Sequence, residues 1–386
     1  MRKPRSYALP IAFLVIALLT APLSLKFLPV PCAWLGLAWS GSLFWATWTD
    51  ARTSRRAIWF NAGVFFLVVA ALEGWLSTQT PAPCKPEGSE QDFFRGHSVL
   101  GYAAQPSSTT EWRKHCGGKL VYDVTYTIDA DGLRVSAPRH ATESSESLLF
   151  FGGSFTFGEG VQDHETMPYV VGQKTGKRYK VYNFGFSGYG AHHMAAATEH
   201  GIVKSIVKEN PKHIIYQAIV DHIRRAAGWQ TWSRDHPKYV LKQNGQCEHT
   251  GSFRKGWEPF FAGISSNLRK SFVLQRLLGS KGRITRRPLT VYVAIVERAR
   301  NLLRGLYPDC RFHTILWDVD EPTWVIDELL EEFAERGIEV HRISEILPDI
   351  AEAEPTRYRI GRREMHPGPR AHERIADYVA RELVSK

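Results

Sequence analysis

The chain has 386 residues and a formal net charge of +10. This length exceeds the roughly 250 to 300 residues at which a single hydrophobic core stops growing, so we expect more than one structural region. The basic excess lies partly among the first residues and is otherwise scattered, which does not indicate nucleic acid as a partner. It is compatible with an anionic lipid surface or an acidic polysaccharide, and equally with a solvated surface that has no partner.

Three apolar stretches, residues 7–25, 30–48 and 57–76, fill the start of the chain. Each is close to the ~20 residues that cross a bilayer as a helix. Glu73 is the only charged residue inside them and lies near an end, whereas soluble core helices would show charged faces. The pattern predicts a transmembrane region of three helices over residues 1–78.

Basic residues set the orientation of this region, because cytoplasmic loops are enriched in Lys and Arg. They precede the first stretch and separate the second from the third, at Arg2, Lys3, Arg5, Arg52, Arg55 and Arg56. We therefore expect a multi-pass protein of the cytoplasmic (inner) membrane with a cytoplasmic N-terminus. Everything after about residue 77 is then periplasmic or extracellular.

Four cysteines follow the apolar region, and an oxidising compartment permits two disulfides among them. Proximity in the sequence favours Cys84 with Cys116 and Cys247 with Cys310, although four cysteines allow three pairings and buried free thiols are the alternative. The sequence leaves this choice open.

The remaining chain divides into a linker and lead-in over residues 79–146 and a larger domain over residues 147–386. The lead-in contains one predicted strand, residues 120–128 (LVYDVTYTI). From residue 147, short apolar runs alternate with amphipathic stretches, which predicts an α/β fold with a parallel sheet. Residues 224–287 break this alternation and are interpreted as an insertion. Its Trp229, Trp232 and Trp257 suit either stacking on sugar rings or packing within the insertion, and packing is the better-supported interpretation.

Three motifs carry candidate chemistry. Ser154 lies in a Gly-rich turn (GGSFTFG, residues 152–158) that follows an apolar strand and opens a helix, a common setting for a nucleophile. A second glycine turn, residues 183–190 (NFGFSGYG), can bring backbone N–H groups to an oxyanion. His366, in the EMHP motif before the last helix, can act as the general base with Glu364 fixing its tautomer.

The order and residues of these motifs resemble the SGNH/GDSL hydrolase family over about residues 147–386. The resemblance implies a three-layer, flavodoxin-like parallel sheet with Ser154, His366 and Glu364 as catalytic residues. Ser154 and Gly188 would contribute to the oxyanion hole. The sequence departs from the family pattern at Gly153, where aspartate is usual, and at Glu364, where the acid is usually aspartate.

The oxyanion hole shows the largest departure. The family places an asparagine after the third strand, and this chain has Asp221 followed by His222. An ionised aspartate cannot donate a hydrogen bond, so either His222 replaces the donor or Asp221 holds another group.

We expect neither a cofactor nor a metal centre. No compact cluster of His, Cys and carboxylate residues has ligand spacing, His192 and His193 are adjacent rather than one helical turn apart, and no P-loop is present.

The leading hypothesis is a serine esterase that acts on O-acyl groups, acetyl in the first instance, of a cell-envelope carbohydrate outside the cytoplasmic membrane. The acyl chemistry follows from the motifs, whereas the substrate class is implied by export, membrane attachment and the family resemblance. One alternative is an O-acyltransferase of the same pathway, partnered by a membrane protein that supplies the acyl donor. Another is a catalytically silent module that binds polysaccharide or acts with an export protein. The distance between Ser154 and His366 separates the active from the silent alternatives.

Overall fold

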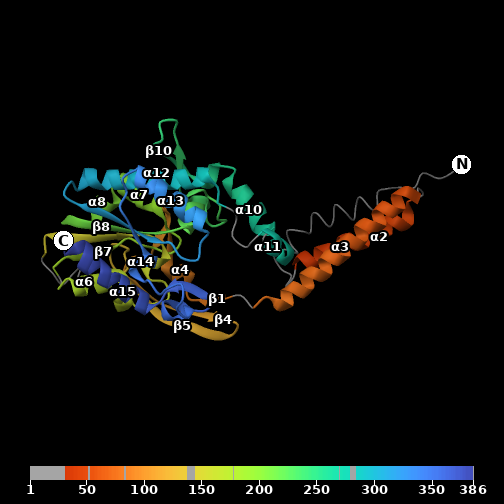
Figure 1. The fold of residues 1–386 in the computed structure, drawn as a ribbon, viewed down its shortest axis with the longest axis horizontal. Coiled ribbons are helices and arrows are strands. Elements are labelled where there is room, and N and C mark those ends of the chain that lie inside the picture. The colour runs from red at the N-terminus through yellow and green to blue at the C-terminus, as the bar shows by residue number, and fades with distance from the viewer. Residues whose placement is uncertain are drawn as a thin grey trace. The chain divides into compact units, whose positions relative to one another are not determined.

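The computed structural model in Figure 1 describes residues 31–50, 53–81, 84–136, 144–176, 178–268, 270–278 and 284–385. The chain divides into two compact units. The first combines Met1–Ala82 with Gly263–Arg283, and the second combines Pro83–Ala262 with Ile284–Lys386. The second unit contains the three candidate catalytic motifs.

Two long helices, α2 (Pro31–Thr49) and α3 (Thr53–Gln79), pack against each other in the first unit, with Trp39 and Phe66 in edge-to-face contact. Among the described residues, only Arg55–Gln79 is long and apolar enough to cross a membrane. The second predicted span coincides with α2, and the first, residues 7–25, lies outside the described part of the chain. Three membrane crossings therefore stay a prediction.

Glu73, the charged residue of the third predicted span, is buried against a short helix from the insertion, α11 (Phe272–Leu278). Its carboxylate accepts hydrogen bonds from the backbone N–H groups of Phe272 at 2.8 Å and Val273 at 3.2 Å, and also contacts the Ser271 hydroxyl. A carboxylate at a helix N-terminus satisfies N–H groups that have no partner within the helix. Part of the predicted insertion thus belongs to the unit of the apolar helices.

The second unit is built on a five-stranded parallel sheet with the order β12-β11-β8-β6-β7. Counted from 1 in chain order and read from the β7 edge, this order is 2-1-3-4-5, which is the flavodoxin-like arrangement. The predicted fold class of this unit is therefore confirmed. The strands are β6 (Glu146–Phe151), β7 (Lys180–Asn183), β8 (Asn210–Ile219), β11 (Arg311–Trp317) and β12 (Val340–Arg342).

Helices cover both faces of the sheet and complete three layers (Figure 1). One face packs on α7 (Ala191–Glu199), α12 (Arg286–Leu306) and α13 (Thr323–Glu335). The other packs on α6 (Met167–Lys174), α14 (Ile343–Ile346) and α15 (Pro369–Tyr378), which continues as a π-helix, Val379–Val384. The smaller elements are α5 (Ser154–Phe157), α8 (Ile202–Ile206), α9 (Asp221–Ala226), β9 (Pro237–Leu241), β10 (Cys247–Ser252), α10 (Glu258–Leu268), β13 (Arg359–Gly361) and β14 (Glu364–Pro367).

The lead-in forms antiparallel strands that pack into the same core as the sheet. One sheet contains β1 (Cys84–Glu87), β4 (Ser108–Cys116) and β5 (Lys119–Ile128), and a hairpin joins β2 (Phe94–His97) to β3 (Gly101–Ala104) after the short helix α4 (Glu90–Phe93). Phe93, between these parts, contacts Phe157 and Phe186 of the two glycine-rich turns. The lead-in is thus part of the compact unit that carries the candidate site.

One of the two cysteine pairings favoured by proximity is correct. Cys84 and Cys116 form a disulfide across the directly opposed ends of β1 and β4. The pairing of Cys247 with Cys310 is wrong, since both are free and buried. Cys247 lies on β10, where its thiol donates a hydrogen bond to the Ala294 carbonyl at 3.3 Å, whereas Cys310 precedes β11. Closeness in the sequence failed as a guide because a hairpin and several helices separate these positions.

Candidate active site

Ser154 lies where the sequence predicts it, at the carboxyl end of β6 and the start of α5. In parallel α/β sheets, ligands bind beyond this end of the strands, next to the point where the strand order reverses. That point lies between β6 and β8 here. The serine is 5% exposed, so little of its side chain is in contact with solvent.

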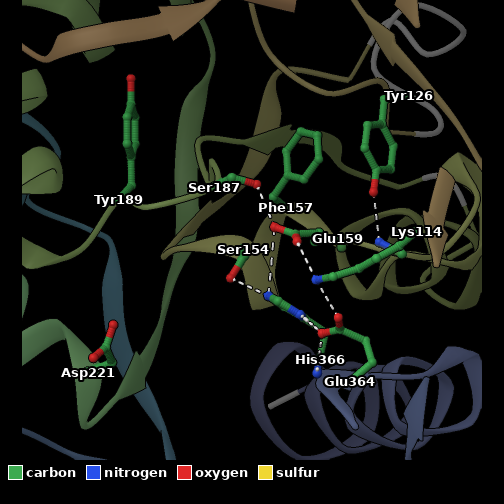
Figure 2. A network of polar contacts seen from close by, with 12 residues as sticks. Lys114, Tyr126, Ser154, Phe157, Glu159, Ser187, Tyr189, Asp221, Glu364 and His366 are labelled. Atoms are coloured by element: carbon green, nitrogen blue, oxygen red, sulfur yellow. Dashed lines mark hydrogen bonds and ion pairs between the residues drawn. The ribbon is translucent and has the colours of Figure 1, made fainter. Parts of the chain in front are cut away.

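His366 and Glu364 complete a hydrogen-bonded chain with Ser154 (Figure 2). The distance between Ser154 Oγ and His366 Nε2 is 2.8 Å, and His366 Nδ1 contacts Glu364 Oε1. Both residues belong to β14, where residues two apart share one face of the strand. The spacing of two residues and the longer glutamate side chain are therefore compatible with a triad of hydroxyl, imidazole and carboxylate.

Two further charged residues surround the imidazole. Lys114, on β4 of the lead-in, forms an ion pair with Glu364 and lies 3.9 Å from Glu159 Oε1. Glu159 Oε2 lies 3.7 Å from His366 Nε2 and accepts a hydrogen bond from Ser187 Oγ at 2.9 Å (Figure 2). Neither residue was predicted from the sequence, although Glu159 follows the nucleophile by only five residues.

The loop that carries Glu159 is held by a buried arginine of the lead-in. Arg134 donates to the carbonyl oxygens of Phe157 at 2.8 Å, Gly158 at 2.5 Å and Val161 at 2.7 Å, and to Asp163 at 2.9 Å. Gly158 adopts a φ of 85°, in the left-handed region that glycine favours. These hydrogen bonds fix the backbone of the loop from which the Glu159 side chain extends.

The charges around His366 set its protonation. Burial alone would lower its pKa, but the carboxylates of Glu159 and Glu364 outweigh burial and raise the pKa of His366 above its ordinary value. Burial also opposes ionisation of Glu364, yet its contacts with His366 and Lys114 lower the pKa of Glu364 to about 2. Glu364 is therefore ionised at neutral pH and suited to stabilising an imidazolium.

On the opposite side of Ser154, Asp221 and His222 have different roles. Asp221 Oδ2 accepts a hydrogen bond from Arg225 Nε at 3.0 Å and lies apart from the triad in Figure 2. His222 is fully buried, and its Nδ1 lies 2.8 Å from the Tyr216 hydroxyl. If that hydroxyl donates to Nδ1, Nε2 carries the proton. In that tautomer the Nε2–H group of His222 is a donor without a hydrogen-bond partner, whereas the carboxylate of Asp221 can only accept.

Gly153 stands where the family usually has aspartate, and its surroundings explain the difference. A Cβ atom added to Gly153 would lie 2.7 Å from Arg225 Nη1, 2.9 Å from His222 Nε2 and 2.9 Å from the Tyr189 carbonyl oxygen. Arg225 donates a hydrogen bond to this same carbonyl at 2.7 Å. The space that an aspartate side chain needs is therefore occupied by α9.

Gly188, the predicted oxyanion glycine, has a φ of 83° and lies against the lead-in and the insertion. The Tyr102 hydroxyl donates to the Ser187 carbonyl at 2.6 Å, and the ring of Trp232 would lie 2.9 Å from a Cβ on Gly188. Trp232 remains 47% exposed, so one of the tryptophans of the insertion presents its ring beside the second glycine turn.

Three solved structures that match this chain are distant from it in sequence. A putative lipolytic protein of G-D-S-L family from Desulfitobacterium hafniense is 13% identical, with a TM-score of 0.34, over 62% of this chain and 100% of its own. An acetyl xylan esterase from Butyrivibrio proteoclasticus is 11% identical, with a TM-score of 0.36, over 79% and 86% respectively. A putative GDSL-like lipase from Bacteroides uniformis is 14% identical, with a TM-score of 0.30, over 62% and 97%.

No protein-family model and no curated protein matches the chain. Two of these structures bear the name of the family that the sequence motifs resemble. Because their TM-scores lie below 0.5, the functional proposal rests on the geometry of the site.

Substitution Glu159→Gln should shift the acidic limb of the pH profile of kcat/KM to lower pH. The imidazole must be neutral to accept the serine proton, and removing the Glu159 charge lowers the pKa of His366. Ester hydrolysis by the full-length protein across pH measures the limb, with the exposed Glu373→Gln as the matched control. If Glu159→Gln is active and its acidic limb stays at the wild-type pH, Glu159 does not raise the pKa of His366.

Substitution His222→Phe should lower kcat by about 10²- to 10³-fold, the usual effect of losing one oxyanion donor. Asp221→Asn, which introduces the residue usual in the family, should change kcat little because residue 221 faces Arg225. Steady-state kinetics on variants with matched thermal unfolding midpoints test this. Normal activity of His222→Phe would show that the oxyanion is stabilised by other groups.

Proposed function

We propose that this chain is a serine ester hydrolase of the SGNH type, acting on O-acyl groups of a cell-envelope carbohydrate outside the cytoplasmic membrane. The observation that carries the proposal is the 2.8 Å contact between Ser154 Oγ and His366 Nε2, with His366 held from its other side by an ionised Glu364. A catalytically silent module has no need of this chain of contacts.

The chemistry follows from these contacts. Ser154 Oγ attacks the ester carbonyl while its proton moves to His366 Nε2, and Glu364 stabilises the resulting imidazolium. His366 then returns the proton to the departing alcohol, which leaves an acyl group on Ser154. Water attacks this acyl-enzyme in a hydrolase, and a second sugar hydroxyl attacks it in an O-acyltransferase.

Support for a carbohydrate substrate comes from the aromatic residues of the insertion. Trp232 is half-exposed next to Gly188, so a sugar ring stacked on it would lie beside the proposed oxyanion site. Trp257 is 74% exposed and offers a second ring. A small acyl group such as acetyl is compatible with a nucleophile that is 5% exposed. These features favour the acylated sugar as the unit that the site recognises.

Support for a membrane location comes from the first unit. The apolar stretch Arg55–Gln79 exposes large side chains along its length, including Phe60, Phe65 and Trp75. Within the same unit, Ile264, Leu268 and Leu277 of the insertion are also exposed. A lipid environment would remove these apolar surfaces from water. The Cys84–Cys116 disulfide in the second unit agrees with an oxidising compartment.

A fluorophosphonate probe should label the full-length protein on Ser154, because the hydroxyl is activated by His366. Mass spectrometry should find the adduct lost in Ser154→Ala and in His366→Ala and retained in Ser205→Ala, an exposed serine on α8. Release of acetate from an acetylated oligosaccharide, compared with transfer to an unacetylated one, then separates hydrolase from transferase. An unlabelled but folded protein favours the silent module.

Reporter fusions to the C-terminus of the full-length chain test the location. Alkaline phosphatase, which is active only after export, should be active in this fusion, and green fluorescent protein exported through the general secretory route should be dark. Fusions placed after Asp50, on the cytoplasmic side of the predicted spans, should show the opposite pattern. A fluorescent C-terminal fusion would place the candidate site in the cytoplasm and overturn this part of the proposal.

A further inference from the structure

Two histidines and a glutamate gather on β11 and β12, at the edge of the sheet opposite β7. His313 lies on β11, His341 on β12, and Glu339 immediately precedes β12. His313 Nδ1 lies 3.3 Å from Glu339 Oε2, and His341 Nε2 lies 3.3 Å from Glu339 Oε1. One ligand atom from each residue falls within 4.8 Å of the others.

The second nitrogen of each ring is already held. His313 Nε2 lies 3.2 Å from His213 Nδ1, and His341 Nδ1 lies 2.9 Å from the Tyr378 hydroxyl of α15. These contacts orient both rings so that His313 Nδ1 and His341 Nε2 face the Glu339 carboxylate. Histidines that bind metals are oriented by the same kind of contact at the nitrogen away from the metal.

The two inward nitrogens have no hydrogen-bond partner although they are buried. Buried polar atoms without partners are uncommon in folded proteins and call for an explanation. A metal ion would give each of these two nitrogens a partner.

We propose that His313, His341 and Glu339 bind a zinc ion, with a fourth position open to solvent beside the half-exposed glutamate. Two ligand atoms ~2.0 to 2.1 Å from a tetrahedral zinc are about 3.3 to 3.4 Å apart, and each nitrogen lies 3.3 Å from a different oxygen of the Glu339 carboxylate. Imidazole and carboxylate are ligands that zinc accepts. The site would add a metal to a chain whose sequence predicts none.

A second histidine cluster lacks these features. His192, His193 and His236 are buried together, but no carboxylate belongs to the group. Burial is the largest cause that lowers the pKa of each ring, and the positive charge of Arg225 lowers each pKa further. A cation there would meet a positive charge with no anion to offset it. The carboxylate distinguishes the site on β11 and β12.

The location indicates a structural role. β12 is a three-residue strand at the edge of the sheet, bonded to β11 alone within it. A metal shared by His313 and His341 would fasten this edge strand to its neighbour and, through Tyr378, to α15. Because β8 lies between β11 and β6, the strand that leads to Ser154, the ion would take no part in acyl transfer.

Zinc titration of the metal-free, full-length protein against a chromophoric chelator tests the proposal. The wild type should bind one zinc ion more than Glu339→Ala or His341→Gln, and zinc should raise the thermal unfolding midpoint of the wild type but not that of these two variants. Glu339 is exposed enough that Glu339→Ala should fold even if His341→Gln does not.

The matched control is His200→Ala, an exposed histidine that contacts His249, and it should retain the wild-type stoichiometry and shift. Equal zinc binding by the wild type and Glu339→Ala, or an equal shift of their unfolding midpoints, would overturn the proposal. Hydrolysis by Glu339→Ala should equal that of the wild type, so failure of the zinc site and failure of the proposed esterase activity are distinguishable.

Discussion

The site depends on how one partly buried ammonium group offsets two carboxylates around an imidazole. Glu364 is almost fully buried and would resist ionisation without compensation, which its contacts with His366 and then with Lys114 provide. Glu159, on the other side of His366, adds negative charge that favours the imidazolium formed during acyl transfer. Without Lys114, two carboxylates would compete for one histidine, so the base strength of His366 is set by the balance among three charged side chains.

This balance explains why the lead-in strands belong to the functional unit rather than to a spacer. Lys114 comes from β4, and Arg134, a little further along, fixes the loop that carries Glu159. Both arrive from outside the five-stranded sheet that presents Ser154. Aromatic packing of Phe93 against Phe157 and Phe186 seats these strands over the catalytic edge. The lead-in therefore packs on the sheet through Phe93 and, through Lys114 and Arg134, helps to set the base strength of His366.

The sequence predicted the parallel sheet and the contacts among Ser154, His366 and Glu364, because each residue follows a short apolar strand or precedes an amphipathic helix. Since the carboxyl ends of parallel strands lie at one edge of the sheet, a residue's place after such a strand also predicts its place in the fold. Lys114 lies 40 residues before Ser154 on a strand whose direction no local pattern fixes. Glu339 and His341 are separated from His313 by a whole helix, so only the register of β11 and β12 brings them together. Proximity in the sequence favoured the Cys84–Cys116 pair, which the register of β1 and β4 places opposite each other, whereas Cys247 and Cys310 lie in separate elements.

The crowding at Gly153 has a consequence for how this chain tolerates change. Arg225, His222 and the Tyr189 carbonyl occupy the volume that the usual aspartate would fill, and Arg225 is itself tied to Asp221. Residues 153, 221 and 225 therefore form an epistatic set in which effects of single substitutions do not add. Aspartate at position 153 would therefore require Arg225, His222 and the Tyr189 carbonyl to move together. Gly153 and the residues of α9 are thus coupled through the space that they share.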